Sequence, residues 1–134
     1  MASPLKVLIV EDDNAMAQMC AKLIRRRGHS AVIAGSCQDA LLIVRTSRDV
    51  DAVLSDIQMP HMSGIELLAK VREFDSHLPI ILMTGYADVV SSAEAMSLGA
   101  TDYLSKPFNA DTLICSLERA FLQRMPASKV PEPA

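Results

Sequence analysis

The chain has 134 residues, the size of one ordinary domain, and is long enough to bury a core without disulfides or a structural metal. Half of its residues are hydrophobic and 22% are charged, a composition that excludes a disordered chain. A net charge of −3, 4% aromatic residues and the absence of tryptophan argue against direct nucleic-acid binding.

Short apolar runs alternate with longer segments of helical spacing along the chain. This alternation predicts repeated strand–helix units, and hence an α/β fold with a parallel sheet. The apolar runs are rich in valine, isoleucine and leucine, as strands covered on both faces require. The five predicted strands span residues 5–10, 30–34, 52–55, 79–83 and 101–104.

The first predicted helix starts near Asn14 and ends before Gly28, a glycine placed where a C-terminal cap is expected. Apolar side chains recur in this segment at the spacing of one helical face. We predict that this face is buried and consists of Met16, Met19, Cys20, Leu23 and Ile24.

The later helices are marked by residues at their ends. Ser36 with Asp39, and Ser63 with Glu66, have the three-residue offset of a capping box, which predicts that helices start there. Gly99 is predicted to close the fourth helix. The buried face of the last helix is predicted at Leu113, Leu117 and Phe121.

Polar side chains follow the predicted strands directly. In an open parallel sheet, ligands bind outside the carboxyl ends of the strands, at the point where the strand order reverses. Segments that are far apart in the chain therefore bring their polar residues to one edge of the sheet. The residues concerned are Glu11, Asp12, Asp13, Asp56, Thr84 and Lys106.

The chemistry of this set favours a metal ion and a phosphate. Clustered carboxylates repel one another unless a cation or a proton compensates their charge, and oxygen ligands favour Mg²⁺, or Mn²⁺ in its place. Lys106 and Thr84 supply donors for phosphoryl oxygens, an arrangement typical of phosphoryl transfer. Asp56 is then the candidate nucleophile, because a carboxylate can accept a phosphoryl group covalently.

Four short motifs carry a resemblance to a known family. They are VLIVEDD at 7–13, LSDIQMPHMSG at 54–64, MTG at 83–85 and YLSKPF at 103–108. In this order and spacing the chain resembles, from about residue 6 to residue 124, the response-regulator receiver domain, the phosphoacceptor module of two-component signalling. The resemblance implies a doubly wound (βα)5 fold of the flavodoxin-like type, whose five-stranded parallel sheet has the order 2-1-3-4-5.

The resemblance also implies roles for the acidic residues. Asp56 would be the phosphorylated aspartate, Asp12 would bind Mg²⁺ directly, and Glu11 would bind it through water. Many relatives have aspartate where this chain has Glu11, and that exchange leaves metal binding intact. The main-chain carbonyl of Gln58 would be a further ligand. Asp13 is interpreted as an exposed helix-start residue and stays a secondary candidate, because the register of the three acids can shift by one.

The resemblance also implies that Thr84 and Tyr103 respond to phosphorylation and form a conformational switch. Lys106 would contact the phosphoryl group, and the bond between it and Pro107 is cis in the family. Thr84 would move to the phosphoryl oxygen while Tyr103 turns inward. These movements would change the surface around the fourth helix, the fifth strand and the fifth helix.

Two further positions bear on the lifetime of the phosphorylated state. Gln58 and Tyr86 lie two residues after Asp56 and Thr84, where the family controls the access of water. A neutral glutamine beside a bulky tyrosine offers no carboxylate to orient water, so we predict an aspartyl phosphate that lasts minutes or longer. Gly85 leaves room for the incoming phosphoryl donor.

The leading interpretation is a signalling phosphoacceptor, not an enzyme, that serves a sensor histidine kinase or a histidine phosphotransfer protein and controls an output domain or target protein. Two alternatives stay open: a metal-dependent phosphohydrolase that forms an aspartyl phosphate, and a receiver that docks without phosphorylation. The hydrolase usually needs a second acid where this chain has Gln58. Dimerisation on phosphorylation is also left open. His29, His61 and His77 are interpreted as surface residues.

The remaining expectations concern the ends of the chain and its thiols. We expect a receiver domain over residues 1–124 and a proline-rich, disordered tail or linker over 125–134. Cys20, Cys37 and Cys115 are widely spaced and form no C-x-x-C motif. This pattern favours reduced thiols over a disulfide framework. No signal pattern and no long apolar run occur, so we expect a cytoplasmic protein without a membrane partner.

Overall fold

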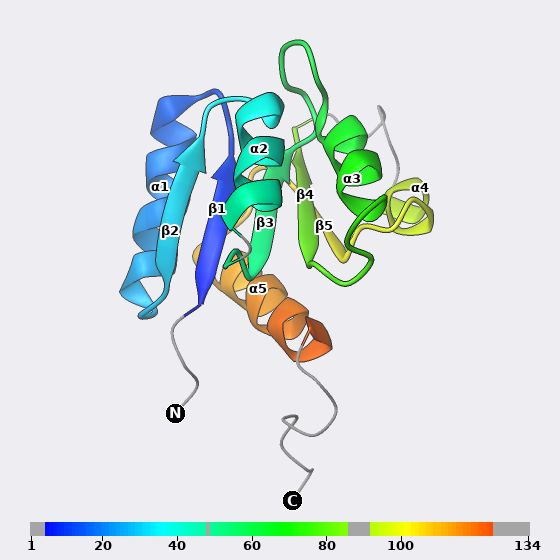
Figure 1. The fold of residues 1–134 in the computed structure, drawn as a ribbon. Helices are drawn as coiled ribbons and strands as arrows, with labels where there is room; N and C mark the ends of the chain where they lie inside the picture. The colour runs from blue at the N-terminus through cyan, green and yellow to red at the C-terminus, as the bar shows by residue number, and fades with distance from the viewer. Residues whose placement is uncertain (1–4, 48, 86–91, 125–134) are drawn as a thin grey trace, which may run out of the picture.

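The computed structural model describes residues 5–47, 49–85 and 92–124 (Figure 1). Over these residues, strands and helices alternate from β1 to α5. The elements are β1 (Lys6–Val10), α1 (Asn14–Arg26), β2 (Ser30–Ala34), α2 (Cys37–Ser47), β3 (Ala52–Asp56), α3 (Gly64–Arg72), β4 (Ile80–Thr84), α4 (Ser92–Ser97), β5 (Asp102–Ser105) and α5 (Ala110–Arg124).

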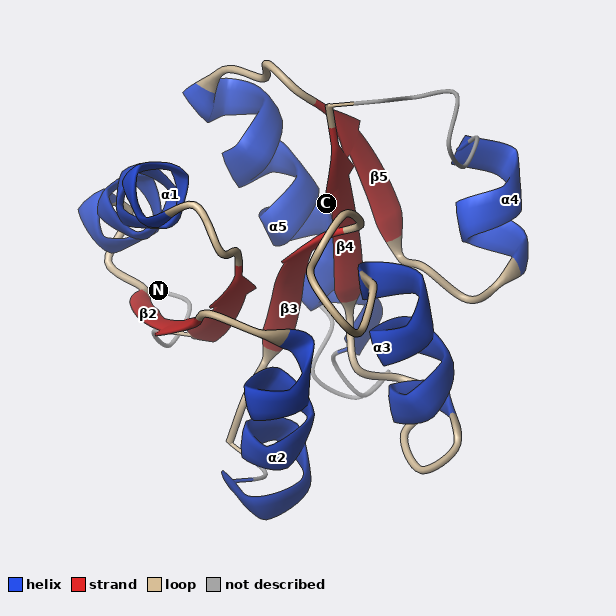
Figure 2. Cartoon of the chain, turned by 90° about the horizontal axis from the view of Figure 1, so that it is seen from above, coloured by secondary structure: helices blue, strands red, loops and turns tan. Residues whose placement is uncertain are grey.

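The five strands form one parallel sheet in the order β2-β1-β3-β4-β5. Figure 2 shows α1 and α5 on one face of the sheet and α2 and α3 on the other. The predicted α/β class, the strand order and the doubly wound arrangement are confirmed. The chain leaves β1 toward β2 and then returns to place β3 on the other side of β1. The order therefore reverses between β1 and β3, and the crevice at this switch point is the expected ligand site.

Two apolar clusters hold the helices against the sheet. One lies under α2, α3 and α4, and the other lies under α1 and α5. Every residue of β3 and β4 is buried, because helices cover both faces of these central strands. This burial explains why the strands have continuous apolar runs in which polar and apolar residues do not alternate.

Strands β3 and β4 extend one residue beyond the predicted apolar runs, to Asp56 and Thr84. Asp56 pairs in register with Met83 of β4, and Thr84 pairs with Ser105 of β5. Backbone hydrogen bonds do not require an apolar side chain, so a polar residue can end a buried strand. Two predicted site residues are thus held by the sheet itself.

Helix α1 has the predicted ends. It begins at Asn14, and the Asp13 carboxylate caps it by accepting hydrogen bonds from the backbone N–H groups of Ala15 and Met16. Gly28, just beyond the helix, has a φ of +87°, which glycine adopts without strain. The interpretation of Asp13 as a helix-start residue is confirmed.

The predicted buried stripe of α1 is wrong in part. Met19 is 44% exposed, and Met16 and Leu23 are only partly buried. The contact face is turned toward two alanines, whose small side chains let the helix approach the sheet closely. The buried residues of α1 are Ala17, Cys20, Ala21 and Ile24.

The other predicted helix ends are confirmed. The hydroxyl oxygens of Ser36 and Ser63 accept hydrogen bonds from the backbone N–H groups of Asp39 and Glu66, each at 3.1 Å. Gly99, two residues after α4, has a φ of +105°. The predicted buried residues of α5, all of them buried, are Leu113, Leu117 and Phe121.

The prediction that His29 is a surface residue is wrong in part, because His29 is only partly exposed. Its Nδ1 accepts a hydrogen bond from the backbone N–H of Leu5 at 3.2 Å, and its ring centroid lies 5.4 Å from that of Phe121. The connection between α1 and β2 brings the imidazole between the start of the sheet and α5. His61 and His77 are exposed, as predicted.

Among the described residues, no helix has the length and apolar character needed to cross a membrane. The three thiols are free: Cys20 and Cys37 are buried and Cys115 is exposed. The predicted tail at 125–134 lies outside the described residues.

Candidate functional site

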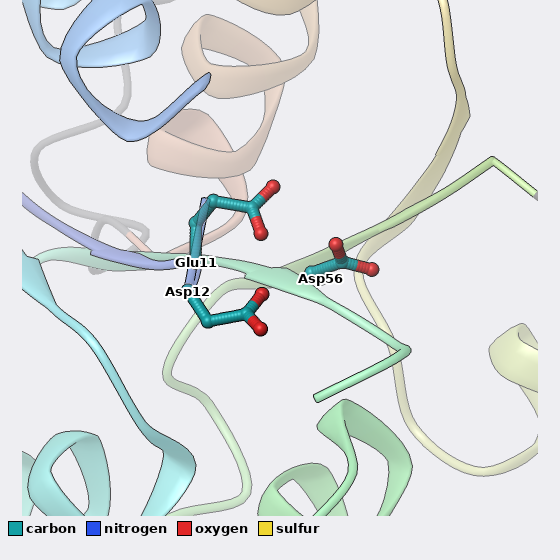
Figure 3. Close-up of side chains that lie close together, drawn as sticks. All are labelled: Glu11, Asp12 and Asp56. Carbon is teal, nitrogen blue, oxygen red and sulfur yellow. The ribbon is translucent and has the colours of Figure 1, made fainter. Parts of the chain in front are cut away.

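Three carboxylates gather at the carboxyl edge of the sheet, at the switch point (Figure 3). Glu11 follows β1 directly, Asp12 comes next, and Asp56 ends β3. One ligand oxygen from each residue lies within 4.8 Å of the other two. Asp12 is exposed, whereas Glu11 and Asp56 are only 3% and 8% exposed. The sheet therefore places two buried carboxylates beside an exposed one.

The ammonium group of Lys106 lies between two of these carboxylates. Its Nζ donates hydrogen bonds to Glu11 Oε1 and to Asp56 Oδ2, both at 2.8 Å. The backbone N–H of Lys106 donates to the carbonyl of Thr84 at 2.7 Å, which fixes the lysine at the end of β5. The bond between Lys106 and Pro107 is cis, as the resemblance implied.

Burial and charge act against each other in this network. Burial raises the pKa of Glu11, and the charge of Asp56 adds to this effect, while the hydrogen bond from Lys106 opposes it. Burial alone would lower the pKa of Lys106, but its bonds to Asp56 and Glu11 outweigh burial and leave that pKa above its usual value. Lys106 is thus an ammonium ion, held by carboxylates that it does not fully neutralise.

The donor set fits a hard divalent cation. Glu11, Asp12 and Asp56 offer carboxylate oxygens within reach of one centre, with no nitrogen or sulfur ligand in the cluster. Mg²⁺ and Mn²⁺ prefer such oxygen ligands. The exposed Asp12 leaves one side of the cluster open to water.

The loop between β3 and α3 holds the Asp56 carboxylate from the other side. The backbone N–H of Gln58 donates to Asp56 Oδ1 at 3.0 Å, so both oxygens of this carboxylate have partners. The N–H of Gly64 closes the loop on the carbonyl of Ile57 at 2.9 Å. A Cβ on Gly64 would collide with the Asp56 carbonyl. No spacing in the sequence predicts this contact, although Gly64 belongs to one of the motifs.

The other predicted site residues lie around this centre. Thr84 is buried at the end of β4, and Tyr103 is partly buried and packs against the cluster under α2, α3 and α4. Gly85 is exposed, and a Cβ there would meet no atom within 4 Å. Asp13 caps α1 and does not belong to the carboxylate cluster of the described residues. Tyr86 lies outside the described residues.

Fold and site together define a doubly wound α/β domain with an acidic pocket and a lysine at its switch point. The sequence profile of the family described as the response regulator receiver domain matches residues 7–118. The chain belongs to this family. Receiver domains are signalling phosphoacceptors, and the family binds Mg²⁺ at an acidic pocket.

Similar curated proteins are longer than this chain. It is 40% identical over 124 residues to the response regulator protein FleR of Pseudomonas aeruginosa, covering 92% of this chain and 26% of FleR. It is 37% identical over 123 residues to the transcriptional regulatory protein FixJ of Bradyrhizobium diazoefficiens, covering 92% of this chain and 60% of FixJ. The chain thus spans about a quarter of one of these relatives and three fifths of the other.

Solved receiver domains have the same fold. The structure of FixJ-N is 31% identical, with a TM-score of 0.81, and the match covers 90% of this chain and 95% of that one. A CheY-like receiver domain from Methanospirillum hungatei is 30% identical, with a TM-score of 0.82, and the match covers 90% and 97%. Each of these likenesses extends over 90% of the chain.

Proposed function

We propose that the chain accepts a phosphoryl group on Asp56 from a phosphohistidine of a sensor histidine kinase or a histidine phosphotransfer protein. The observation that carries the proposal is the restrained Asp56 carboxylate. It lies 2.8 Å from the Lys106 ammonium and within 4.8 Å of oxygens of Glu11 and Asp12. A nucleophile held in this way, beside positive charge, is suited to phosphoryl transfer.

The proposed transfer needs one bond to form and one to break. A carboxylate oxygen of Asp56 bonds to phosphorus while the bond from phosphorus to the imidazole nitrogen breaks, and its electron pair stays on that nitrogen. The Lys106 ammonium offsets charge on the phosphoryl oxygens. The phosphoryl group stays on the protein, so the chain acts as a phosphoacceptor that promotes its own modification and its slow reversal.

Glu11, Asp12 and Asp56 would hold Mg²⁺, with Mn²⁺ as a substitute, and the main-chain carbonyl of Gln58 would be a further ligand. When bound, the ion supplies positive charge that stabilises the phosphoryl oxygens. The exposed Asp12 suits direct binding. Glu11 is buried and already paired with Lys106, which suits binding through water.

The output of the domain would be a change of surface. The Thr84 hydroxyl would donate to the phosphoryl group and Tyr103 would turn inward, which alters the face formed by α4, β5 and α5. This face would control an output domain or a target protein in the cytoplasm, and a phosphorylation-dependent dimer is one form that the control can take. The receiver would span residues 1–124, with 125–134 as a linker.

The proposal is tested by incubating the full chain with acetyl phosphate and Mg²⁺ and measuring its intact mass. The wild-type chain should gain one phosphoryl group, and removal of Mg²⁺ with a chelator should prevent the gain. Asp56→Asn should gain none. Asp39→Asn is the matched control, because Asp39 is an exposed aspartate in the first turn of α2. A phosphoryl group on Asp56→Asn would contradict the assignment.

A further inference from the structure

Helix α3 touches the phosphoacceptor strand at its first residue. Gly64 donates its N–H to the carbonyl of Ile57 at 2.9 Å. The space that a Cβ on Gly64 would occupy is filled by the Asp56 carbonyl. The start of α3 and the backbone of Asp56 are therefore in direct contact, and a shift of one displaces the other.

The body of α3 is packed along one side. Its nine residues span about 13 Å at the usual rise of a helix. Leu67, Leu68 and Val71 are fully buried in the apolar cluster beneath it. A hydrogen-bonded helix in a close-packed interior resists compression, so a displacement of its first turn reaches its last turn.

The last residue of α3, Arg72, binds the turn that follows α4. Its Nε and Nη2 both donate to the carbonyl of Gly99, at 3.0 and 2.8 Å, and its Nη1 donates to the carbonyl of Asp75 at 3.0 Å. A Cβ on Gly99 would lie 3.2 Å from Arg72 Nε. The glycine thus allows both the positive φ of the turn and the close approach of the guanidinium.

Exposed apolar side chains lie beside this contact. Met96 and Leu98 are 47% and 50% exposed. The N–H of Gly99 donates to the carbonyl of Met96 at 3.1 Å, and the N–H of Leu98 donates to that of Glu94 at 3.0 Å. These bonds make the turn continuous with α4, so a movement of Gly99 changes how both apolar side chains are presented.

We propose that α3 is a mechanical link between Asp56 and the turn from α4 to β5, with Arg72 as the positioning residue that holds Gly99. The inference rests on the proposed function, because the state of Asp56 is what the link transmits. The link starts at the backbone of Asp56, whereas the switch described above starts at the hydroxyl of Thr84. Coupling between two sites acts in both directions, so loosening the Gly99 end must alter binding at Asp56.

The test uses beryllofluoride with Mg²⁺ as the probe and backbone amide NMR of the full chain as the readout. In the wild type, the amides of Gln58 and Gly99 should both shift on binding. In Arg72→Met, the Gln58 shift should stay while the Gly99 shift falls below about half of its wild-type size. The affinity for beryllofluoride should rise about fivefold, because binding no longer has to move the turn.

Two variants separate this role from a loss of charge or of stability. Lys70→Met removes an exposed charge from the same last turn and should behave like the wild type. Arg72→Lys keeps the charge without the planar fork and should also lose most of the Gly99 shift, which provides the test if Arg72→Met does not fold.

A full Gly99 shift, or an unchanged affinity, in the Arg72 variants would overturn the link while leaving the proposed function intact. A wild-type chain in which neither Gln58 nor Gly99 shifts would overturn the proposed function, and the link with it.

Discussion

Two lysine–aspartate pairs lie at opposite ends of the same sheet. Lys106 Nζ is 2.8 Å from Asp56 Oδ2, and Lys6 Nζ is 3.0 Å from Asp49 Oδ2. The chemical groups are the same and the distances are nearly equal. The Asp56 side chain is 11% exposed, however, whereas that of Asp49 is 60% exposed.

The difference in burial decides what each pair can do. Water and salt screen the exposed pair, so it has little effect on anything beyond itself. In the buried pair the charges act strongly on each other and on any group that enters. Lys106 also faces a second carboxylate, Glu11, whose pKa is raised by burial. Among the described residues, Glu11, Asp12 and Asp56 thus gather beside the ammonium of Lys106, and a cation would offset the remaining negative charge.

Replacing each lysine in turn should show the largest difference between the two pairs, in the rate of phosphorylation. Lys106→Met should slow phosphorylation by acetyl phosphate by about a hundredfold, because the phosphoryl oxygens lose their charged donor beside the buried Asp56 carboxylate. Lys6→Met removes an equivalent ammonium from the other end of the sheet and should leave the rate unchanged. The rates follow from intact-mass time courses. Equal rates for the two variants would contradict the distinction.

The backbone around Asp56 provides a second contrast, between two glycines at the same edge of the sheet. Gly64→Ala should lower the free energy of unfolding by about 2–3 kcal/mol, because the new methyl group collides with the Asp56 carbonyl. Gly35→Ala should cost nothing, since a Cβ there meets no atom within 4 Å. Urea unfolding measures both. If the Gly64 variant were as stable as the Gly35 variant, the Asp56 carbonyl would move away from the new methyl group without cost, and the close contact would not restrain it.

An added carboxylate at the rim of the pocket should shorten the life of the aspartyl phosphate. Gln58 is exposed and neutral, and the wild-type phosphate should last for minutes or longer. Gln58→Glu should shorten its half-life by about tenfold, because a carboxylate can orient the attacking water. The measurement is the decay of the phosphorylated mass after acetyl phosphate is removed, with Gln58→Met as the uncharged control. Equal decay of the two variants would contradict this account.

Removing the exposed pair of Lys6 and Asp49 should have the smallest effect, and that effect is on stability. The Lys6 ammonium lowers the pKa of Asp49, so any stabilisation is present at neutral pH and is lost as the pH falls through that lowered pKa. Asp49→Asn should leave the urea midpoint at neutral pH nearly unchanged, and high salt should remove any remaining difference. A large, salt-resistant loss of stability would mean that this pair is not screened.

The meeting of Glu11, Asp56 and Lys106 could be predicted from the sequence. Each follows or ends a strand, and parallel strands bring their carboxyl ends to one edge. The end of α1 before Gly28 was predictable for a similar reason, because a cap depends on residues close in the chain. Features that depend on neighbouring residues, or on the direction of the strands, can thus be predicted from the sequence.

Contacts between distant segments could not be predicted in this way. Arg72 and Gly99 are 27 residues apart and share no motif, and their contact depends on how α3 and α4 pack. Met19 has the helical spacing of a buried residue, but the small alanines of α1 turn the contact face away from it. His29 likewise depends on the position of α5. Packing geometry decides all three.

The most direct test of the central claim is to locate the phosphoryl group. After incubation with acetyl phosphate and Mg²⁺, the aspartyl phosphate can be trapped by borohydride reduction and its position found by peptide mapping. The account predicts the modification at Asp56 and a much lower yield in Lys106→Met. Modification at another residue, or at Asp56 with equal yield in Lys106→Met, would contradict it.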